Sequence, residues 1–130
     1  MSEGVFLAPR IVDTSDQSTC KQFVQATAFG TAGIVVMAKP GRIYKMTVNN
    51  SSANRYYVQL HNKATAAVDT EVPIYEQDLP ASGVCLIDFG LNGWYFSTGC
   101  SLAISTTKSV LTLAAGTDCS AYGLYLVKTS

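Results

Sequence analysis

Charge is scarce in this chain. Only 14% of its 130 residues are charged, and nine bases balance nine acids, so the formal net charge is zero. A protein that binds nucleic acid through its phosphates needs a basic excess, which is missing here. Because low-charge surfaces that lean towards the apolar tend to associate with other proteins, we expect protein partners and an oligomer, and no nucleic acid.

Long apolar runs are also absent. The longest, residues 33–38 (GIVVMA), is far too short to cross a bilayer. Residues 1–10 (MSEGVFLAPR) hold an acid near the start and few apolar residues, unlike a secretory leader. We therefore expect a soluble protein that is made in the cytoplasm and has no contact with a membrane.

Catalytic and cofactor motifs are missing. The chain has no phosphate-binding loop, no Gly-x-Gly-x-x-Gly before a helix and no Gly-x-Ser-x-Gly elbow. Its single histidine, His61, falls at an outward position of a predicted strand, and no motif pairs it with a Ser or Cys nucleophile. We expect His61 to be a surface residue, and we expect no enzyme activity, catalytic residue, metal or cofactor.

The four cysteines are too far apart for a Cys-x-x-Cys pair, which argues against a zinc or redox motif. They are Cys20, Cys85, Cys100 and Cys119. Four cysteines allow three disulfide connectivities. Buried thiols that act as small apolar side chains in a reducing cell are the favoured interpretation, and the sequence leaves the oxidation state open.

Acidic residues gather in one stretch, residues 69–78 (DTEVPIYEQD). Pro73 in this stretch suits a strand at the edge of a sheet. Charge at such an edge prevents wrong pairing, which is the favoured role of these acids. A calcium site and a catalytic carboxylate pair are the alternatives. The acids are Asp69, Glu71, Glu76 and Asp78.

From residue 33 onwards, short β-type segments alternate with turn signals about every ten residues, and no amphipathic helix is evident. This spacing predicts eight or nine strands in one all-β domain, an antiparallel β-sandwich of jelly-roll or Greek-key type. Residues 83–90 (GVCLIDFG) are apolar enough to predict a strand buried on both faces, and residues 109–115 (SVLTLAA) predict another strand.

Apolar and polar residues alternate in residues 41–50 (GRIYKMTVNN) and 55–62 (RYYVQLHN), as half-buried strands require. Because only a short polar loop separates the two segments, we predict that they form an antiparallel hairpin. The inward positions are Tyr44, Met46, Val48, Tyr56, Val58 and Leu60.

Residues 1–30 show no clear period and predict an extended N-terminal arm before a sandwich of residues 31–130. Apolar side chains on such an arm would be buried against a neighbouring subunit or another protein. The candidate partner-binding residues are Val5, Phe6, Leu7, Ile11, Val12 and Phe23.

Aromatic residues offer a second candidate surface. The consecutive Trp94, Tyr95 and Phe96 cannot all face the core, so at least one of them is available to solvent or to a partner. Together with Tyr57, Trp94 and Tyr95 are candidates for a protein interface or for a platform that stacks sugar rings, and the interface is favoured.

Two stretches resemble a pattern found in small structural proteins of tailed bacteriophages. That pattern combines a Y-x-x-x-V-x-N strand and an R-Y-x-x-L strand with a later DFG…G…FSTGxxxAxSTT segment. The resemblance covers residues 41–107, about half the chain. The matching positions are Tyr44, Val48, Asn50, Arg55, Tyr56, Gln59, Leu60, Asp88, Phe89, Gly90, Gly93, Phe96, Ser97, Thr98, Gly99, Ala103, Ser105, Thr106 and Thr107.

The resemblance implies a β-sandwich component of a virion that is assembled in the host cytoplasm. A capsid decoration (cement) protein that binds and stabilises the shell of the major capsid protein, arranged as a homotrimer, is the favoured member of this class. A receptor-binding or carbohydrate-binding module of a tail or fibre is the alternative.

Overall fold

The computed structural model describes residues 20–128, apart from the side chains of residues 26 and 27. Five of the six arm residues named above therefore lie outside the described residues, namely Val5, Phe6, Leu7, Ile11 and Val12. Phe23 lies inside them, and its position is given below.

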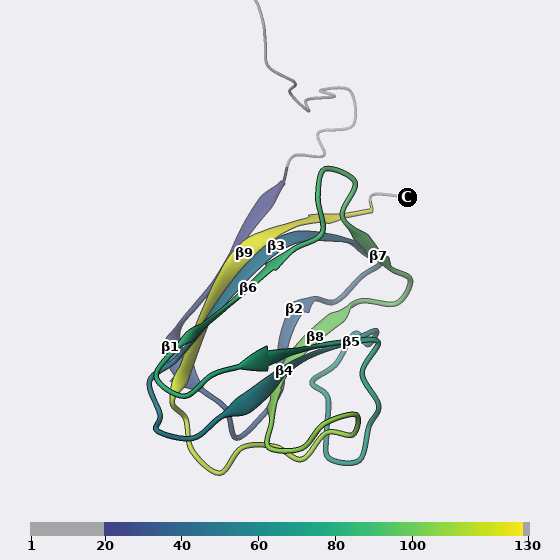
Figure 1. Cartoon of the computed structure of the whole chain (residues 1–130). Coiled ribbons are helices and arrows are strands. Elements are labelled where there is room, and N and C mark those ends of the chain that lie inside the picture. The colour runs from purple at the N-terminus through teal and green to yellow at the C-terminus, as the bar shows by residue number, and fades with distance from the viewer. Residues whose placement is uncertain (1–19, 129–130) are drawn as a thin grey trace, which may run out of the picture.

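Within residues 20–128 the chain forms nine strands and no helix. The strands are β1 (Lys21–Phe29), β2 (Ile34–Met37), β3 (Gly41–Asn50), β4 (Tyr56–His61), β5 (Tyr75–Leu79), β6 (Val84–Asp88), β7 (Trp94–Phe96), β8 (Cys100–Ser105) and β9 (Cys119–Val127). One sheet has the order β1-β9-β3-β6, with β7 paired to β3, and the other has the order β2-β8-β4-β5. The two sheets pack face to face, as Figure 1 shows. All pairs are antiparallel, so the predicted antiparallel β-sandwich is confirmed.

The core lies between the two sheets. Its most deeply buried side chains come from both layers, including Ile43 and Val48 of β3 and Val58 and Leu60 of β4. The predicted inward phase of β4 is therefore correct. In β3 it is correct for Met46 and Val48, but Tyr44 is only half buried, because the register with β9 shifts between Ile43 and Lys45 and puts Ile43 inside instead.

The predicted hairpin between the segments at residues 41–50 and 55–62 is wrong. β3 pairs with β6, β7 and β9, whereas β4 pairs with β5 and β8 in the other sheet. The polar loop between them is a corner that crosses from one sheet to the other. Asn50 fixes this corner from inside, because its buried amide donates to the carbonyl oxygens of Asn54 at 2.8 Å and Pro80 at 3.0 Å.

Two further strand predictions need correction. β6 is not buried on both faces: Val84 and Leu86 are exposed, because β6 lies at the border of its sheet and no other described segment covers its outer face. Residues 109–115 lie in a loop, joined to the sheet by a single bridge between Ser105 and Leu113.

The sandwich begins earlier than the predicted boundary at residue 30. β1 already belongs to the five-stranded sheet and pairs with β9 along residues 21–25 and at Phe29. Phe23, predicted to be an arm residue that contacts a partner, is partly buried and packs against the core of its own sandwich. Residues 21–29 are thus sheet, not arm.

Candidate functional site

Over β4 and β8, the outer face of the four-stranded sheet is covered by the chain itself, whereas the outward Val35 of β2 is exposed. Two loops, residues 62–74 and 106–118, lie over β4 and β8, and both strands are consequently buried on both faces. Beneath the loops is a second small core, formed by Ala67, Ala103 and Leu111 with Leu113 packed against it.

Backbone hydrogen bonds join the two covering loops. The amide of Thr70 donates to the carbonyl oxygen of Leu111, and the amide of Leu111 donates to the carbonyl oxygen of Glu71, both at 2.8 Å. The Asp69 carboxylate accepts from the amide of Leu113 at 2.7 Å. The loops therefore form one layer, and we expect them to open together if they open at all.

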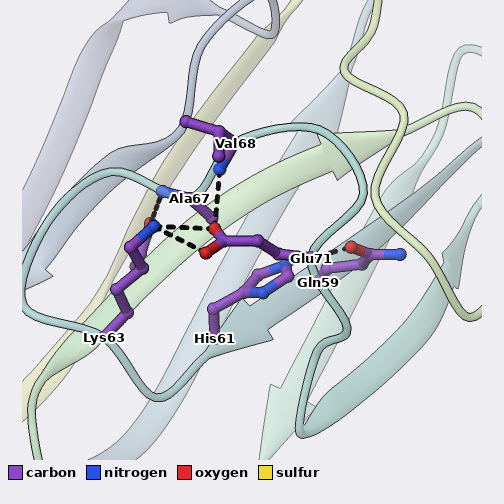
Figure 2. Close-up of polar contacts among 7 residues, drawn as sticks. Gln59, His61, Lys63, Ala67, Val68 and Glu71 are labelled. Atoms are coloured by element: carbon purple, nitrogen blue, oxygen red, sulfur yellow. Dashed lines mark hydrogen bonds and ion pairs between the residues drawn. The ribbon is translucent and has the colours of Figure 1, made fainter.

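His61 lies under this layer, so the prediction of a surface histidine is wrong. Its outward phase on β4 is as predicted, but the loops leave only 3% of the residue exposed. Its Nε2 lies 3.0 Å from Gln59 Oε1, as Figure 2 shows. The amide nitrogen of Gln59 donates to Glu76 Oε2 at 2.8 Å, and Glu76 accepts from the backbone amide of Ser109 at 2.9 Å. A continuous polar chain thus links β4 to the loop of residues 106–118.

Glu71 anchors the other covering loop. Lys63 Nζ donates to its two carboxylate oxygens at 2.7 and 2.8 Å, and the amide of Val68 donates to it at 2.8 Å (Figure 2). The hydrogen bond from Lys63 is the main cause that lowers the pKa of Glu71 below its ordinary value. Burial lowers the pKa of His61, although the nearby Glu71 charge acts in the opposite direction.

Beside this cluster is a shallow depression of about 420 Å³, lined by His61, Asn62, Lys63, Glu71, Val72 and Ile74. The polar side chains of this cluster already have partners within the protein. Gln59 forms a hydrogen bond with the His61 ring, and Lys63 forms an ion pair with Glu71. Within residues 20–128 there is no group of three His, Cys, Asp or Glu side chains that could hold a metal. The cluster of Gln59, His61, Lys63 and Glu71 thus attaches the covering loops to the sheet.

The four acids of residues 69–78, for which a calcium site or a catalytic pair was the alternative to protection of a sheet edge, each have a separate partner. Asp69 and Glu71 hold the covering loops, and Glu76 holds Gln59 and Ser109. Asp78 forms an exposed ion pair with Arg55 at 2.8 Å. The expected edge position is confirmed for β5, which is the last strand of its sheet.

The outer face of the five-stranded sheet is different, because nothing in residues 20–128 covers it. The strand registers align Val24 of β1, Tyr122 of β9, Thr47 of β3 and Leu86 of β6 in one line across the sheet. We call these four residues the exposed row. Leu86 is 67% exposed, and Val24 and Tyr122 are exposed to about half their surface, at 57% and 49%.

Mostly polar residues lie on either side of the exposed row. One flanking line contains Gln22, Leu124, Lys45 and Asp88, and the other contains Ser120, Asn49 and Val84. The loop that follows β6 carries Leu91, which is 97% exposed. The exposed row and its two flanking lines are called the outer sheet face below.

The sequence could not single out this row. Residues 84–87 (VCLI) are apolar at every position, so their alternation is hidden, and the structure alone shows that Cys85 and Ile87 point inward while Val84 and Leu86 point outward. Residues 21–29 also alternate too weakly for the sequence to predict a strand there, so the outward position of Val24 follows from the structure alone.

Trp94, one of the aromatic candidates, is packed within the molecule. Its ring makes edge-to-face contacts with Phe89 and Tyr75, at centroid distances of 5.0 and 5.4 Å. Contacts of this kind stabilise a fold beyond the area that they bury. About a third of Trp94 remains exposed, which leaves one border of the residue available to a ligand or partner.

Tyr57 and Tyr95 lie on different sheets. Tyr95 is on β7, below the guanidinium of Arg42 at 5.4 Å, and Tyr57 is on β4, below that of Arg55 at 5.6 Å. The three predicted aromatic residues are therefore not brought together as one platform.

The four cysteines are free thiols, and three of them are buried as predicted for small apolar side chains. Burial raises the pKa of Cys85 and of Cys119 to about 11, and it also raises the pKa of Cys100. Cys20, just before β1, is exposed.

No protein-family model, curated protein or solved structure matches the chain. Residues 20–128 contain no helix that is long and apolar enough to span a membrane. The case for a function therefore depends on the sequence pattern and on the contrast between the two outer faces.

Proposed function

We propose that the protein is a non-enzymatic structural subunit that attaches to other protein subunits through its outer sheet face. The observation that carries this proposal is the contrast between the two sheets. The exposed row of Val24, Tyr122, Thr47 and Leu86 lies open on one sheet, whereas loops of the same chain cover β4 and β8 of the other sheet. A soluble monomer rarely leaves a contiguous apolar surface open unless something binds there.

The energetics favour binding at this face. Full burial of a Val or Leu side chain contributes about 1.5–3 kcal/mol, and three or more apolar side chains are available. The outward positions of the strands carry few charges, so desolvation costs little: Lys45 and Asp88 lie directly opposite each other on neighbouring strands.

Within this class, we propose a capsid decoration (cement) protein of a tailed bacteriophage, located in the virion and bound to the major capsid protein as a homotrimer. This finer assignment is supported by the resemblance of residues 41–107 to phage structural proteins. Many symmetric copies on a shell would add avidity to an interface of modest size.

The second candidate is a receptor-binding or carbohydrate-binding module of a tail or fibre. The observation in its favour is the partly exposed pair Trp94 and Tyr95 on β7, with Arg42 over the Tyr95 ring. If this candidate is correct, Tyr95→Ala abolishes binding to a glycan array, whereas Leu86→Asp leaves it intact.

Attachment to particles tests the proposal. Leu86→Asp places a charge in the exposed row, and Val72→Asp is a matched control, because Val72 is similarly exposed, at 69%, but lies on a covering loop of the other sheet. Purified tagged protein is added to particles that lack it, and bound copies are counted by quantitative mass spectrometry. We expect Leu86→Asp to remain folded and lose attachment, and Val72→Asp to bind like the wild type.

Two results would overturn the proposal. One is binding of Leu86→Asp at the wild-type level, and the other is the absence of the protein from purified virions. The copy number separates locations: hundreds of copies per particle indicate the capsid, and a few tens or fewer indicate the tail.

A further inference from the structure

The loop between β6 and β7 contains an Asn-Gly pair, Asn92-Gly93, and none of the other four asparagines precedes a glycine. In such a pair the backbone nitrogen of the glycine reaches the side-chain amide of the asparagine most easily, because glycine has no side chain to hinder the approach. Whether a folded chain permits this attack depends on the exposure of the asparagine and on the groups that hold its amide.

Asn92 is exposed, and its side-chain amide forms no hydrogen bond with the residues in 20–128. The amide of Asn50, in contrast, donates to two carbonyl oxygens, and the amide of Asn62 donates to a serine hydroxyl oxygen at 2.9 Å. Asn54 is exposed, but the bulky Arg55 follows it. Among the five asparagines, Asn92 alone combines an exposed amide that no neighbour holds with a glycine in the next position.

The fold requires a glycine at position 93. Gly93 has a φ of 68°, a left-handed conformation that side chains disfavour, and a Cβ there would lie 2.9 Å from the carbonyl oxygen of Ile43 and 3.0 Å from the ring of Tyr44. The backbone nitrogen of Gly93, which is the attacking atom, donates to the carbonyl oxygen of Gly90 at 3.3 Å. This hydrogen bond is longer than the usual distance of about 2.9–3.0 Å, so it restrains the nitrogen only weakly.

We propose that Asn92 is a site of spontaneous deamidation in the folded protein, and that Arg42 directs the product towards isoaspartate. This inference is independent of the proposed function. The backbone nitrogen of Gly93 gives its proton to water and forms a bond to Cγ of Asn92. The Cγ–Nδ2 bond then breaks, and Nδ2 leaves as ammonia after it takes up a proton from solvent. The product is a five-membered succinimide ring, and the step needs no oxidant or reductant.

Water opens the succinimide ring at one of two carbonyl carbons. Attack at Cγ gives aspartate, whereas attack at the backbone carbonyl carbon of residue 92 gives isoaspartate, in which the former backbone carbonyl becomes a free carboxylate. Arg42 Nη1 donates to this backbone oxygen of Asn92 at 3.1 Å. The guanidinium is therefore placed to stabilise the oxyanion that forms there when water attacks, and afterwards it pairs with the new carboxylate. Both effects favour isoaspartate.

Peptide mapping of the full, folded chain tests the site of modification. The protein is incubated at pH 8 in H₂¹⁸O, so that conversion during the incubation places ¹⁸O in the new carboxylate, and the peptides are analysed by mass spectrometry. We expect conversion at Asn92 and none at Asn54, which is the control within the chain because it is exposed but precedes Arg55. Asn92→Gln should abolish conversion at this position, because the longer side chain would have to close a less favourable six-membered ring.

The ratio of isoaspartate to aspartate, measured by electron-transfer fragmentation, tests the role of Arg42. The chain unfolded in urea gives the reference ratio, because its guanidinium is not held at the Asn92 carbonyl. We expect a severalfold higher ratio in the folded wild type, and Arg42→Gln should return the ratio to the reference. Lys45→Gln, which removes another exposed base of β3, is the matched control and should keep the high ratio. Circular dichroism verifies that both variants are folded.

The inference fails if Asn92 stays unmodified in the folded chain while the unfolded chain is converted, because the fold then prevents the attack. Conversion of Asn54 to the same extent as Asn92 also overturns it, since the glycine would then have no special role. Equal ratios of isoaspartate to aspartate in the folded wild type and in Arg42→Gln would overturn the role assigned to the guanidinium.

Discussion

His61 Nε2 lies 3.0 Å from Oε1 of Gln59, two residues earlier on the outward side of β4. On an open sheet both side chains would face water, but here both are buried, because the chain closes this face with its own loops. The outward side chains of β6 and β9 include Leu86 and Tyr122, which have no such cover within residues 20–128. The fold thus buries the outward Gln59 and His61 under its own loops and leaves the outward Leu86 and Tyr122 open.

Gln59→Ala should destabilise the fold by about 1–3 kcal/mol, because it leaves the buried His61 ring without its partner and removes one of the partners of Glu76, which keeps the amide of Ser109. The measurement is the free energy of unfolding in urea, followed by the fluorescence of the single tryptophan, Trp94. Gln77→Ala is the matched control. Gln77 is only half buried, so its loss should cost less, and an equal loss in the two variants would contradict a special role for Gln59.

Stability should fall as the pH decreases through about 6.5. Burial lowers the pKa of His61 below 6.5, its unfolded value, so the unfolded chain binds more protons in this window. The loss has a slope of at most about 1.4 kcal/mol per pH unit for one group. Glu71, whose pKa is lowered from 4.5, adds a second loss only at lower pH, as its carboxylate is protonated.

Urea unfolding of the wild type and of His61→Gln between pH 5 and 7.5 tests this dependence. The variant should have a flat profile in this window, because it has no imidazole to protonate. The neighbouring Lys63 also acts on His61, so Lys63→Gln serves as a control that should retain the slope. A slope in His61→Gln equal to that of the wild type would assign the titration to another group.

Alternation within strands could be predicted from the sequence, but strand pairing could not. The inward positions of β4, such as Val58 and Leu60, follow directly from the period of two. The partner of β3 depends on the path of the polar loop, which the buried Asn50 side chain turns into a corner. A polar loop of this length in the sequence is compatible with either a hairpin or a corner.

Exposure of the outward positions could not be predicted either, because it depends on loops far away in the sequence. His61 and Leu86 are both outward residues, yet one is buried under residues 62–74 and 106–118 and the other is open. The loops cover the four-stranded sheet because Ala67 and Leu111 pack on Ala103. Isolated apolar residues in loops give no periodic signal that would reveal this contact.

Removal of the Asp69 carboxylate should loosen both covering loops at once. Asp69→Ala takes away the acceptor for the amide of Leu113, and the backbone bonds between Thr70, Glu71 and Leu111 then lose their support. In hydrogen exchange, we expect faster exchange in residues 66–72 and also in 110–114, by about tenfold for each 1.4 kcal/mol lost.

An aspartate on the other sheet is the control for this experiment. Asp88 accepts from the amide of Gly90 at 2.8 Å, so Asp88→Ala should affect only residues 89–93. Faster exchange confined to residues 110–114 in Asp69→Ala would mean that the loops open independently, contrary to the single layer inferred from their hydrogen bonds.

Only one of the four thiols should react quickly with a water-soluble disulfide reagent in the folded protein. Cys20 is exposed, whereas Cys85, Cys100 and Cys119 are buried. Burial also raises the pKa of Cys85 and Cys119 to about 11, so little thiolate, the reactive form, is present at pH 8. The expected stoichiometry is one fast thiol in buffer and four in denaturant, and Cys20→Ser should remove the fast phase. A second fast thiol in Cys20→Ser would show that the sandwich opens to solvent at one of the three buried positions.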